Sequence, residues 1–325
     1  MAARRVIGVD LGGTKLLAGA VDERMRVHHR AQRTVAGLDQ SALLETTLDA
    51  VQEVRESTDA EISAVGFGIP ALIDQRTGIA AMSVHLPLAE LAFGDLMTER
   101  IGLPVFVDND ANVTALAEHR SGAARGAREA VVLTIGTGIG GGLIIGDEVY
   151  RGSVGAGAEL GHVVIDMDGP PCQGNCPNRG CVEALASGTA LVREAHRIAG
   201  ERPHSGLGRA LSSGRALMGP LVTELAHDGD EAAIDVIALI GSRLGVAIAS
   251  FVNIFNPEVV VIGGGVIAAG ELLLGPARDV VATRALPPSR DLVRILAARY
   301  GVEAGMVGAA AMAFDGLPHQ AEATT

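Results

Sequence analysis

VIGVDLGGTKLLAGAVD, residues 6–22, reads as an apolar strand, a glycine-rich turn and a second apolar strand that closes on an aspartate. The same pattern returns at residues 131–147 as VVLTIGTGIGGGLIIGD. Residues 26–34 follow the first copy with a third strand pattern, so the opening predicts an antiparallel meander. Two copies of one strand–turn–strand unit predict a chain that contains two related halves.

Strand and helix patterns alternate along the rest of the chain. Strands are expected within residues 64–70, 105–110, 257–266 and 293–300. Helices are expected within residues 40–57, 111–120, 187–199, 219–227, 230–255, 269–284 and 306–314. This alternation predicts an α/β fold, with a boundary between the halves near Ser121 and Gly122.

The composition indicates a globular protein and argues against two classes of partner. At 325 residues the chain suits two domains, and 48% hydrophobic content supplies a core for each. The 38 acidic residues outnumber the 26 basic ones, and the resulting net charge of −12 would repel a nucleic-acid backbone. The longest charge-free run, residues 130–146, is shorter than the ~20 apolar residues of a membrane-spanning helix. Neither nucleic acid nor a membrane is therefore an expected partner.

All three cysteines lie within residues 172–181, and His162 precedes them. An aspartate at position 10 interrupts any apolar stretch of the kind found in signal peptides, which predicts a reducing, cytoplasmic location. The spacing His162-x9-Cys172-x3-Cys176-x4-Cys181 supplies one nitrogen and three sulfur ligands, the usual set of a closed tetrahedral Zn²⁺ site. Free buried thiols and a redox loop with one disulfide are the alternatives.

Both repeated glycine turns are candidate phosphate sites, because the absent side chains let backbone amides approach an anion closely. The candidate residues are Asp10, Gly12, Gly13, Thr14 and Lys15 in the first turn, and Gly136, Thr137 and Gly138 in the second. The threonines would donate hydroxyl hydrogen bonds, and Asp10 would reach a Mg²⁺ ion directly or through water. Neither turn has P-loop or Rossmann spacing, and each alone is equally compatible with a plain connection between strands.

A third glycine turn, Gly263-Gly264-Gly265, follows the buried strand pattern VVVI and precedes a helix. Bare backbone at this position would let a flat base or a ribose lie against it. Close packing of the following helix is the alternative explanation.

Acidic side chains provide the candidates for chemistry and for sugar binding. Asp108, Asn109 and Asp110 stand where a strand ends and a helix begins, the edge at which open α/β sheets usually keep their sites. Asp110 is a candidate general base and equally a candidate helix N-cap. Glu159 and Glu183 flank the cysteine segment, and a metal-ordered loop would hold both carboxylates where they accept hydrogen bonds from sugar hydroxyls. The alternative is two solvated glutamates.

With these motifs together, the sequence resembles the ROK family, which groups bacterial sugar kinases with related transcriptional repressors. The resemblance covers essentially the whole chain and rests on DLGGTK, DNDAN, GTGIGGG, GAGAELGH, CPNRGCVEALASG and VVVIGGG. It implies an actin-like, hexokinase-type (ribonuclease H-like) fold with two lobes that close over a sugar and ATP. Residues 1–121 would form the small lobe and residues 122–305 the large lobe with its zinc loop, 161–183. A terminal helix, about 306–315, would return to the small lobe.

The resemblance further implies an ATP-dependent hexose kinase, with glucose as the leading substrate. Asp110 would be the catalytic base, and the sugar would also contact Asn109, Glu159, His162 and Glu183. The implied cofactors are ATP, Mg²⁺ and a structural Zn²⁺ held by His162, Cys172, Cys176 and Cys181. A homodimer or higher homo-oligomer is the expected assembly.

Two segments depart from the family pattern and keep other substrates open. Cys172 and Cys176 are separated by three residues where the family usually has Cys-x-Cys. His85 stands in VHLPL, at a position where the family commonly has asparagine. Mannose, N-acetylmannosamine or another hexosamine is therefore an alternative substrate, and polyphosphate an alternative donor. A sugar-sensing repressor would need a DNA-binding domain before the first strand, where five residues stand. An actin-like scaffold would need neither the aligned base nor the cysteine loop.

Overall fold

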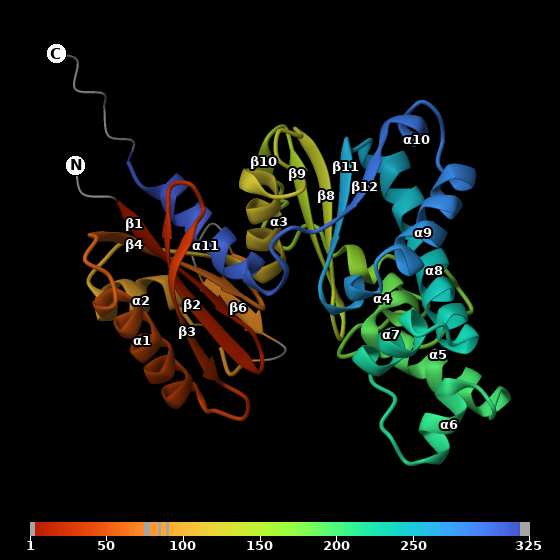
Figure 1. Ribbon diagram of the computed structural model, residues 1–325. Coiled ribbons are helices and arrows are strands. Elements are labelled where there is room, and N and C mark those ends of the chain that lie inside the picture. Colours follow the sequence, from red (N-terminus) through yellow and green to blue (C-terminus); the bar gives the residue numbers. More distant parts are fainter. Residues whose placement is uncertain (1–3, 75–78, 84–85, 89–90, 319–325) are drawn as a thin grey trace. The chain divides into compact units, whose positions relative to one another are not determined.

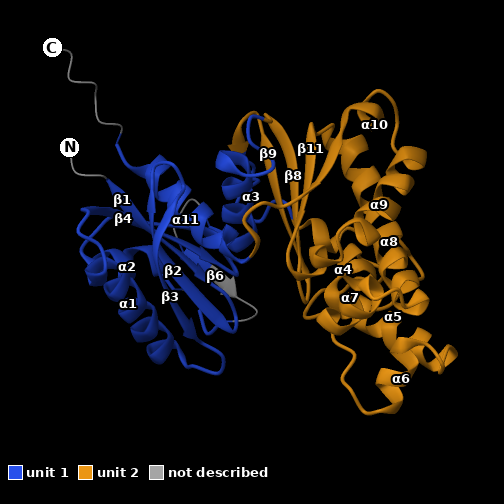
Figure 2. Cartoon of the chain, viewed as in Figure 1, with its two compact units in different colours: residues 1–126, 149–158, 302–325 blue, residues 127–148, 159–301 orange. Residues whose placement is uncertain are grey.

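The computed structural model describes residues 4–74, 79–83, 86–88 and 91–318, which form two compact units (Figure 1; Figure 2). Unit 1 comprises residues 1–126, 149–158 and 302–325, and unit 2 comprises residues 127–148 and 159–301. A short segment from the middle of the chain and the C-terminal segment thus belong to the same unit as the N-terminus.

Unit 1 is built on a five-stranded sheet in the order β3-β2-β1-β4-β7. Its strands are β1 (Arg5–Leu11), β2 (Lys15–Asp22), β3 (Val27–Thr34), β4 (Ile62–Ile69) and β7 (Val105–Asn109). β1, β2 and β3 pair antiparallel, which confirms the predicted meander, and β4 and β7 continue the sheet in parallel. A separate hairpin pairs β5 (Ala71–Asp74) with β6 (Ile79–Ser83).

Helices cover both faces of this sheet (Figure 1). They are α1 (Gln40–Glu56), α2 (Phe93–Ile101), α3 (Asp110–Ser121) and α11 (Ala304–Gly316). α1 and α2 share a core with the odd-numbered residues of β1, whereas α11 packs over β1 and β4 and beside α3. Gly8 and Gly66 face α11, and a β-carbon at either would come within 1.9 Å of a carbonyl oxygen of that helix. The C-terminal helix therefore lies directly on the backbone of the central strands.

The sheet of unit 2 has the order β10-β9-β8-β11-β12. Its strands are β8 (Glu129–Ile135), β9 (Ile139–Ile145), β10 (Glu148–Val149), β11 (Val259–Gly263) and β12 (Arg294–Ala297). β8 and β9 are antiparallel, and β11 and β12 continue from β8 in parallel. This repeats the sheet of unit 1 strand for strand, so the duplication expected from the two glycine turns extends to the whole sheet.

The helices of unit 2 gather around one long central helix, α8. They are α4 (Val182–Ala186), α5 (Gly188–Glu201), α6 (Gly206–Ser212), α7 (Gly219–His227), α8 (Glu231–Phe255), α9 (Glu271–Arg284) and α10 (Ser289–Leu292). Gly241 and Gly245 of α8 lie under carbonyl oxygens of α9, which lets the two helices pack closely. Among the described residues, α8 alone has the length and apolarity of a membrane-spanning helix, and 61% of its most apolar window is buried inside the protein.

Every helix and strand pattern identified in the sequence corresponds to an element, with ends shifted by a few residues. The elements that were not predicted are α2, the β5–β6 hairpin, β10, α4, α6 and α10. The structure also corrects one detail at α3, because the helix begins at Asp110 and Asn109 is its N-cap.

Candidate functional site

Asp108 is the most constrained of the three polar residues at the end of β7. The residue is 2% exposed. One carboxylate oxygen accepts hydrogen bonds from the Asn109 amide (2.8 Å) and the Asn112 side chain (3.0 Å), and the other accepts from Arg151 Nε (2.7 Å). Since both oxygens are engaged within unit 1, this carboxylate anchors local structure and is poorly suited to accept a substrate proton.

Asn109 and Asp110 divide the roles that the sequence left open for Asp110 alone. The Asn109 side chain accepts hydrogen bonds from the amides of Ala111 (2.9 Å) and Asn112 (3.4 Å), so it caps α3. The N-cap alternative for Asp110 is therefore wrong. Asp110 occupies the first turn of α3, where the helix N-terminus stabilises a negative charge.

A second carboxylate, Asp10 at the end of β1, interacts electrostatically with Asp110. Burial, followed by the negative charge of Asp110, raises the pKa of Asp10 to about 7. The first turn of α11 closes over Asp10, because a β-carbon at Gly305 would lie 2.5 Å from the Asp10 carboxyl carbon. Glycine at position 305 is thus required for space. Two interacting carboxylates can share a proton or a divalent cation, and oxygen ligands are those that Mg²⁺ prefers.

The glycine turn after Asp10 joins β1 to β2. The amide of Gly12 donates to the carbonyl of Lys15 (2.9 Å), which closes the turn. Thr14 and Lys15 are exposed, and Gly12 and Gly13 are partly exposed. The turn that follows Asp10 in the chain therefore presents a hydroxyl, an ammonium and bare backbone to solvent.

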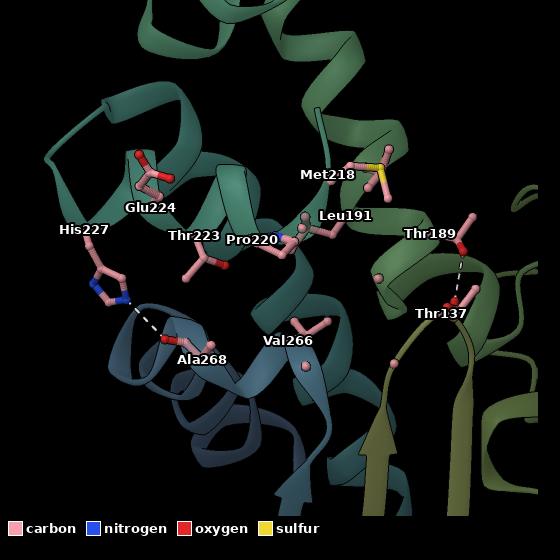
Figure 3. Close-up of a pocket in the computed structure, with 15 residues that line it drawn as sticks. Thr137, Thr189, Leu191, Met218, Pro220, Thr223, Glu224, His227, Val266 and Ala268 are labelled. Atoms are coloured by element: carbon pink, nitrogen blue, oxygen red, sulfur yellow. Dashed lines mark hydrogen bonds between the residues drawn. The ribbon is translucent and has the colours of Figure 1, made fainter. Parts of the chain in front are cut away.

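The matching turn of unit 2 borders a cavity of about 770 Å³ (Figure 3). The cavity is lined by Gly136, Thr137, Gly188, Thr189, Leu191, Val192, Met218, Gly219, Pro220, Thr223, Glu224, His227, Gly265, Val266 and Ala268. Figure 3 shows two hydrogen bonds among its lining residues, from Thr189 Oγ1 to the Thr137 carbonyl (2.9 Å) and between His227 Nε2 and the Ala268 carbonyl (3.1 Å). Apolar side chains and bare glycine backbone form most of the wall, which suits a flat aromatic group.

The third predicted glycine turn forms one side of this cavity. Gly264 has φ +86°, and a β-carbon there would lie 2.4 Å from the Ile135 carbonyl oxygen, so both conformation and space require glycine. A β-carbon at Gly265, which lines the cavity, would meet no atom within 4 Å. Gly263 ends β11. The turn therefore combines tight packing at Gly264 with an open backbone surface at Gly265.

The structure brings His162 and the three cysteines together. One potential ligand atom from each of the four residues lies within 4.8 Å of the others. Cys172 Sγ is 3.5 Å from His162 Nδ1, and Cys176 Sγ is 3.9 Å from Cys181 Sγ. Zn–S bonds of ~2.3 Å and Zn–N bonds of ~2.0 Å in a tetrahedron separate the ligand atoms by roughly 3.5–3.8 Å. The two spacings therefore fit a Zn²⁺ ion despite the widened Cys172–Cys176 interval.

The chemistry of these thiols also fits a bound cation. Burial and the neighbouring thiols raise the pKa of Cys172 to about 12, and burial raises the pKa of Cys181. The thiols of Cys172 and Cys181 therefore stay neutral alone, whereas a cation would stabilise the thiolates. The four residues thus form a candidate zinc site within unit 2.

Glu159 and Glu183, the two predicted sugar contacts of the cysteine region, both lie beside the β8–β9 hairpin. Glu159 precedes the short 3₁₀ helix η1 (Leu160–His162), which packs against β9 so closely that a β-carbon at Gly161 would lie 2.2 Å from a carbonyl oxygen of β9. Glu183 lies in the first turn of α4, and its Oε2 accepts a hydrogen bond from the Ile139 amide (2.8 Å).

Two features of the site escaped the sequence, and one prediction falls outside the described residues. The Arg151–Asp108 ion pair joins residues 43 positions apart, and Gly305 lies almost 300 positions after Asp10. Neither contact can be recognised from a short stretch of sequence, because the two residues in each are far apart in the chain. His85, expected to influence sugar choice, lies outside the described residues.

Comparison with known proteins gives one consistent match. Residues 6–315 match the ROK family. A glucokinase from Thermotoga maritima is 37% identical over 95% of this chain and 96% of its own length. A ROK family glucokinase from Streptomyces griseus, solved with glucose and AMPPNP, is 34% identical, with a TM-score of 0.85 over 96% of this chain and all of that one. A xylose repressor from Caldicellulosiruptor bescii is 28% identical over 86% of this chain and 70% of the repressor.

Proposed function

This chain belongs to the ROK family, and we propose that it is an ATP-dependent glucokinase, which transfers the γ-phosphoryl group of ATP to a primary hydroxyl of D-glucose. One observation carries this assignment above the others. The chain is similar over 96% of its length to an enzyme solved with glucose and an ATP analogue. We assign the groups that such a reaction requires to residues of both units.

Unit 2 is assigned the nucleotide. The apolar cavity would hold the adenine, Gly265 would offer bare backbone to the base or ribose, and the β8–β9 turn would bind phosphates through the amides around Thr137. These assignments follow from the concave, largely apolar wall with a few polar groups at its rim, which is typical of nucleotide-sized sites.

We assign two roles to unit 1: contact with the terminal phosphates of ATP, and acceptance of the proton of the sugar hydroxyl. The β1–β2 turn, with Gly12, Gly13, Thr14 and Lys15, would also contact phosphate. Asp10 would hold Mg²⁺, which when bound neutralises charge on the phosphate oxygens. Asp110 would accept or orient the proton of the sugar hydroxyl, because both oxygens of Asp108 are already engaged.

The sugar is assigned to Asn109, Asp110, Glu159, His162 and Glu183. Carboxylates and amides select hydroxyl patterns because an unmatched buried polar group is costly. His162 is also assigned to the zinc site, so zinc binding would hold this sugar contact in place directly. It would hold Glu183 in place indirectly, through Cys181 at the start of α4. A homodimer is the assembly we expect from the family.

A panel of hexoses with ATP and Mg²⁺ tests the function directly. Glucose is expected to give the highest kcat/KM in a coupled ADP assay, with mannose and N-acetylmannosamine behind it. A higher value with N-acetylmannosamine would replace glucose as the substrate. Turnover with polyphosphate in place of ATP would change the donor, and the absence of turnover with every hexose would overturn the kinase assignment.

A further inference from the structure

The turn between β8 and β9 is held from one side by the chain that follows His162. The Gly188 amide donates to the Gly136 carbonyl (2.8 Å), and Thr189 Oγ1 donates to the Thr137 carbonyl (2.9 Å). The Ile139 amide donates to Glu183 Oε2 (2.8 Å). Of these three bonds, only the one to Glu183 uses a charged group, and hydrogen bonds to charged groups are the strongest.

The contact between Glu183 and the turn leaves no spare room. A β-carbon at Gly138 would lie 2.3 Å from Glu183 Oε2 and 3.1 Å from its carboxyl carbon. The backbone of Gly138 does not lie in the left-handed region, so conformation does not demand glycine there. A side chain at position 138 would therefore displace the flexible end of Glu183 from the turn.

The backbone of Glu183 and its second carboxylate oxygen lie next to the cysteine segment. Glu183 lies two residues after Cys181, which is buried and is the N-cap residue of α4. Its Oε1 lies 3.8 Å from Cys172 Sγ. The carboxylate thus lies between the cysteine cluster and the glycine turn within unit 2.

We infer that Glu183 is a positioning residue for the nucleotide, one that holds the Gly136–Ile139 turn in its phosphate-binding shape through the Ile139 amide. This role rests on the kinase function proposed above and is separate from the sugar contact assigned to the same residue. It makes nucleotide affinity dependent on a side chain that need not touch the nucleotide. Because a sugar would engage the same carboxylate, sugar and nucleotide would bind with coupled affinities.

A double-mutant cycle between Gly138 and Glu183 tests this role. Affinity for a non-hydrolysable ATP analogue with Mg²⁺ is measured by calorimetry without sugar in the parent, Gly138→Ala, Glu183→Ala and the double variant. Each single change should weaken binding about tenfold, since each breaks a hydrogen bond to a charged group. The double variant should bind no more weakly than Glu183→Ala, because Gly138→Ala acts by displacing that side chain.

Two controls separate positioning from a general loss of structure. Gly136→Ala lies in the same turn, where a β-carbon meets no atom within 4 Å, so its effect should add to that of Glu183→Ala. Glu183→Gln keeps an acceptor for the Ile139 amide and should stay within about threefold of the parent. Additive effects of Gly138→Ala and Glu183→Ala would overturn the role, as would parent-like binding by Glu183→Ala.

Amide hydrogen exchange of ligand-free protein tests the tether independently of any nucleotide. Exchange at Ile139 should be at least tenfold faster in Glu183→Ala than in the parent and nearly unchanged in Glu183→Gln. Unchanged exchange in Glu183→Ala would overturn the tether even if the protein is a kinase. A parent that binds no ATP analogue would instead refute the proposed function, while the exchange comparison would still decide whether Glu183 holds the turn.

Discussion

The β1–β2 hairpin of unit 1 and the β8–β9 hairpin of unit 2 share one backbone design but carry different chemistry. Both place a glycine turn at the same position of a sheet with the same strand order. The turn in unit 1 is exposed and stands beside Asp10, whose pKa is raised. The turn in unit 2 borders an apolar cavity and is held by Glu183. A duplicated frame can thus serve two purposes, because function depends on the side chains around each turn.

The largest expected effect concerns the proposed base of unit 1, Asp110, in the first turn of α3. Asp110→Asn cannot accept a proton, so kcat should fall by roughly 10²–10⁴. Because Asn109 and not Asp110 caps α3, the free energy of unfolding should change by less than ~1 kcal/mol. Steady-state kinetics, with calorimetry for glucose and the ATP analogue, would check both parts. A variant with parent-like kcat would remove Asp110 from the chemistry.

In unit 2, the shape of the β8–β9 turn is expected to depend on the cysteine cluster that supports Glu183. The parent should contain about one zinc per chain, and Cys181→Ala should lose it, since three ligands hold the ion far less tightly than four. The variant should also unfold at lower temperature and bind the ATP analogue more weakly, because α4 and Glu183 lose their support. Metal analysis of protein purified without added zinc measures the first effect, and zinc-free active parent protein would contradict it.

A destabilising substitution in unit 1 should leave the zinc content of the protein unchanged. Asp108→Asn breaks a buried ion pair with Arg151, and we expect it to lower the free energy of unfolding by about 2–3 kcal/mol. This loss lies at the low end of what breaking a buried ion pair costs, because the Arg151 side chain is 32% exposed and can be hydrated once the pair is broken. Urea denaturation measures the loss. Zinc content equal to that of the parent would show that destabilising unit 1 leaves the zinc site of unit 2 intact. A loss of zinc in Asp108→Asn would contradict this independence of the two sites.

A further expected effect is a dependence of stability on pH. The pKa of Asp10 in the folded protein is about 7, above its ordinary value of 3.8, so folding favours the neutral carboxyl. Its contribution to stability is full below about pH 4 and is lost as pH rises through about 7. Asp10→Asn stays neutral and should become more stable relative to the parent across this window, by up to ~1.4 kcal/mol per pH unit. Urea denaturation at several pH values checks this, and parallel curves for the two proteins would contradict it.

The sequence was informative where the signal is local. Strand periodicity and glycine turns identified both hairpins, and cysteine spacing identified a cluster whose ligand atoms lie within 4.8 Å. The β5–β6 hairpin, with strands of four and five residues, was not predicted. The choice between Asn109 and Asp110 as the cap also required coordinates, since both residue types cap helices well.

Long-range pairings explain what else the sequence could not provide. Arg151 reaches Asp108 from a segment that interrupts unit 2 in sequence but belongs to unit 1. Gly305 fits over Asp10 only because α11 returns to the first sheet. The tight contact of Gly138 with Glu183 likewise joins a glycine-rich turn to a distant helix. Each of these depends on tertiary packing, for which a single sequence holds no periodic signal.

Phosphoryl transfer itself can be followed by ³¹P NMR with the parent protein, ATP, Mg²⁺ and glucose. A glucokinase should convert the γ-phosphate signal into that of glucose 6-phosphate in equal amount to the ADP formed, with the conversion dependent on glucose. Release of inorganic phosphate alone, or ATP left unchanged in the presence of glucose, would contradict the assignment of a phosphate-binding turn in each unit and a sugar-activating base at Asp110.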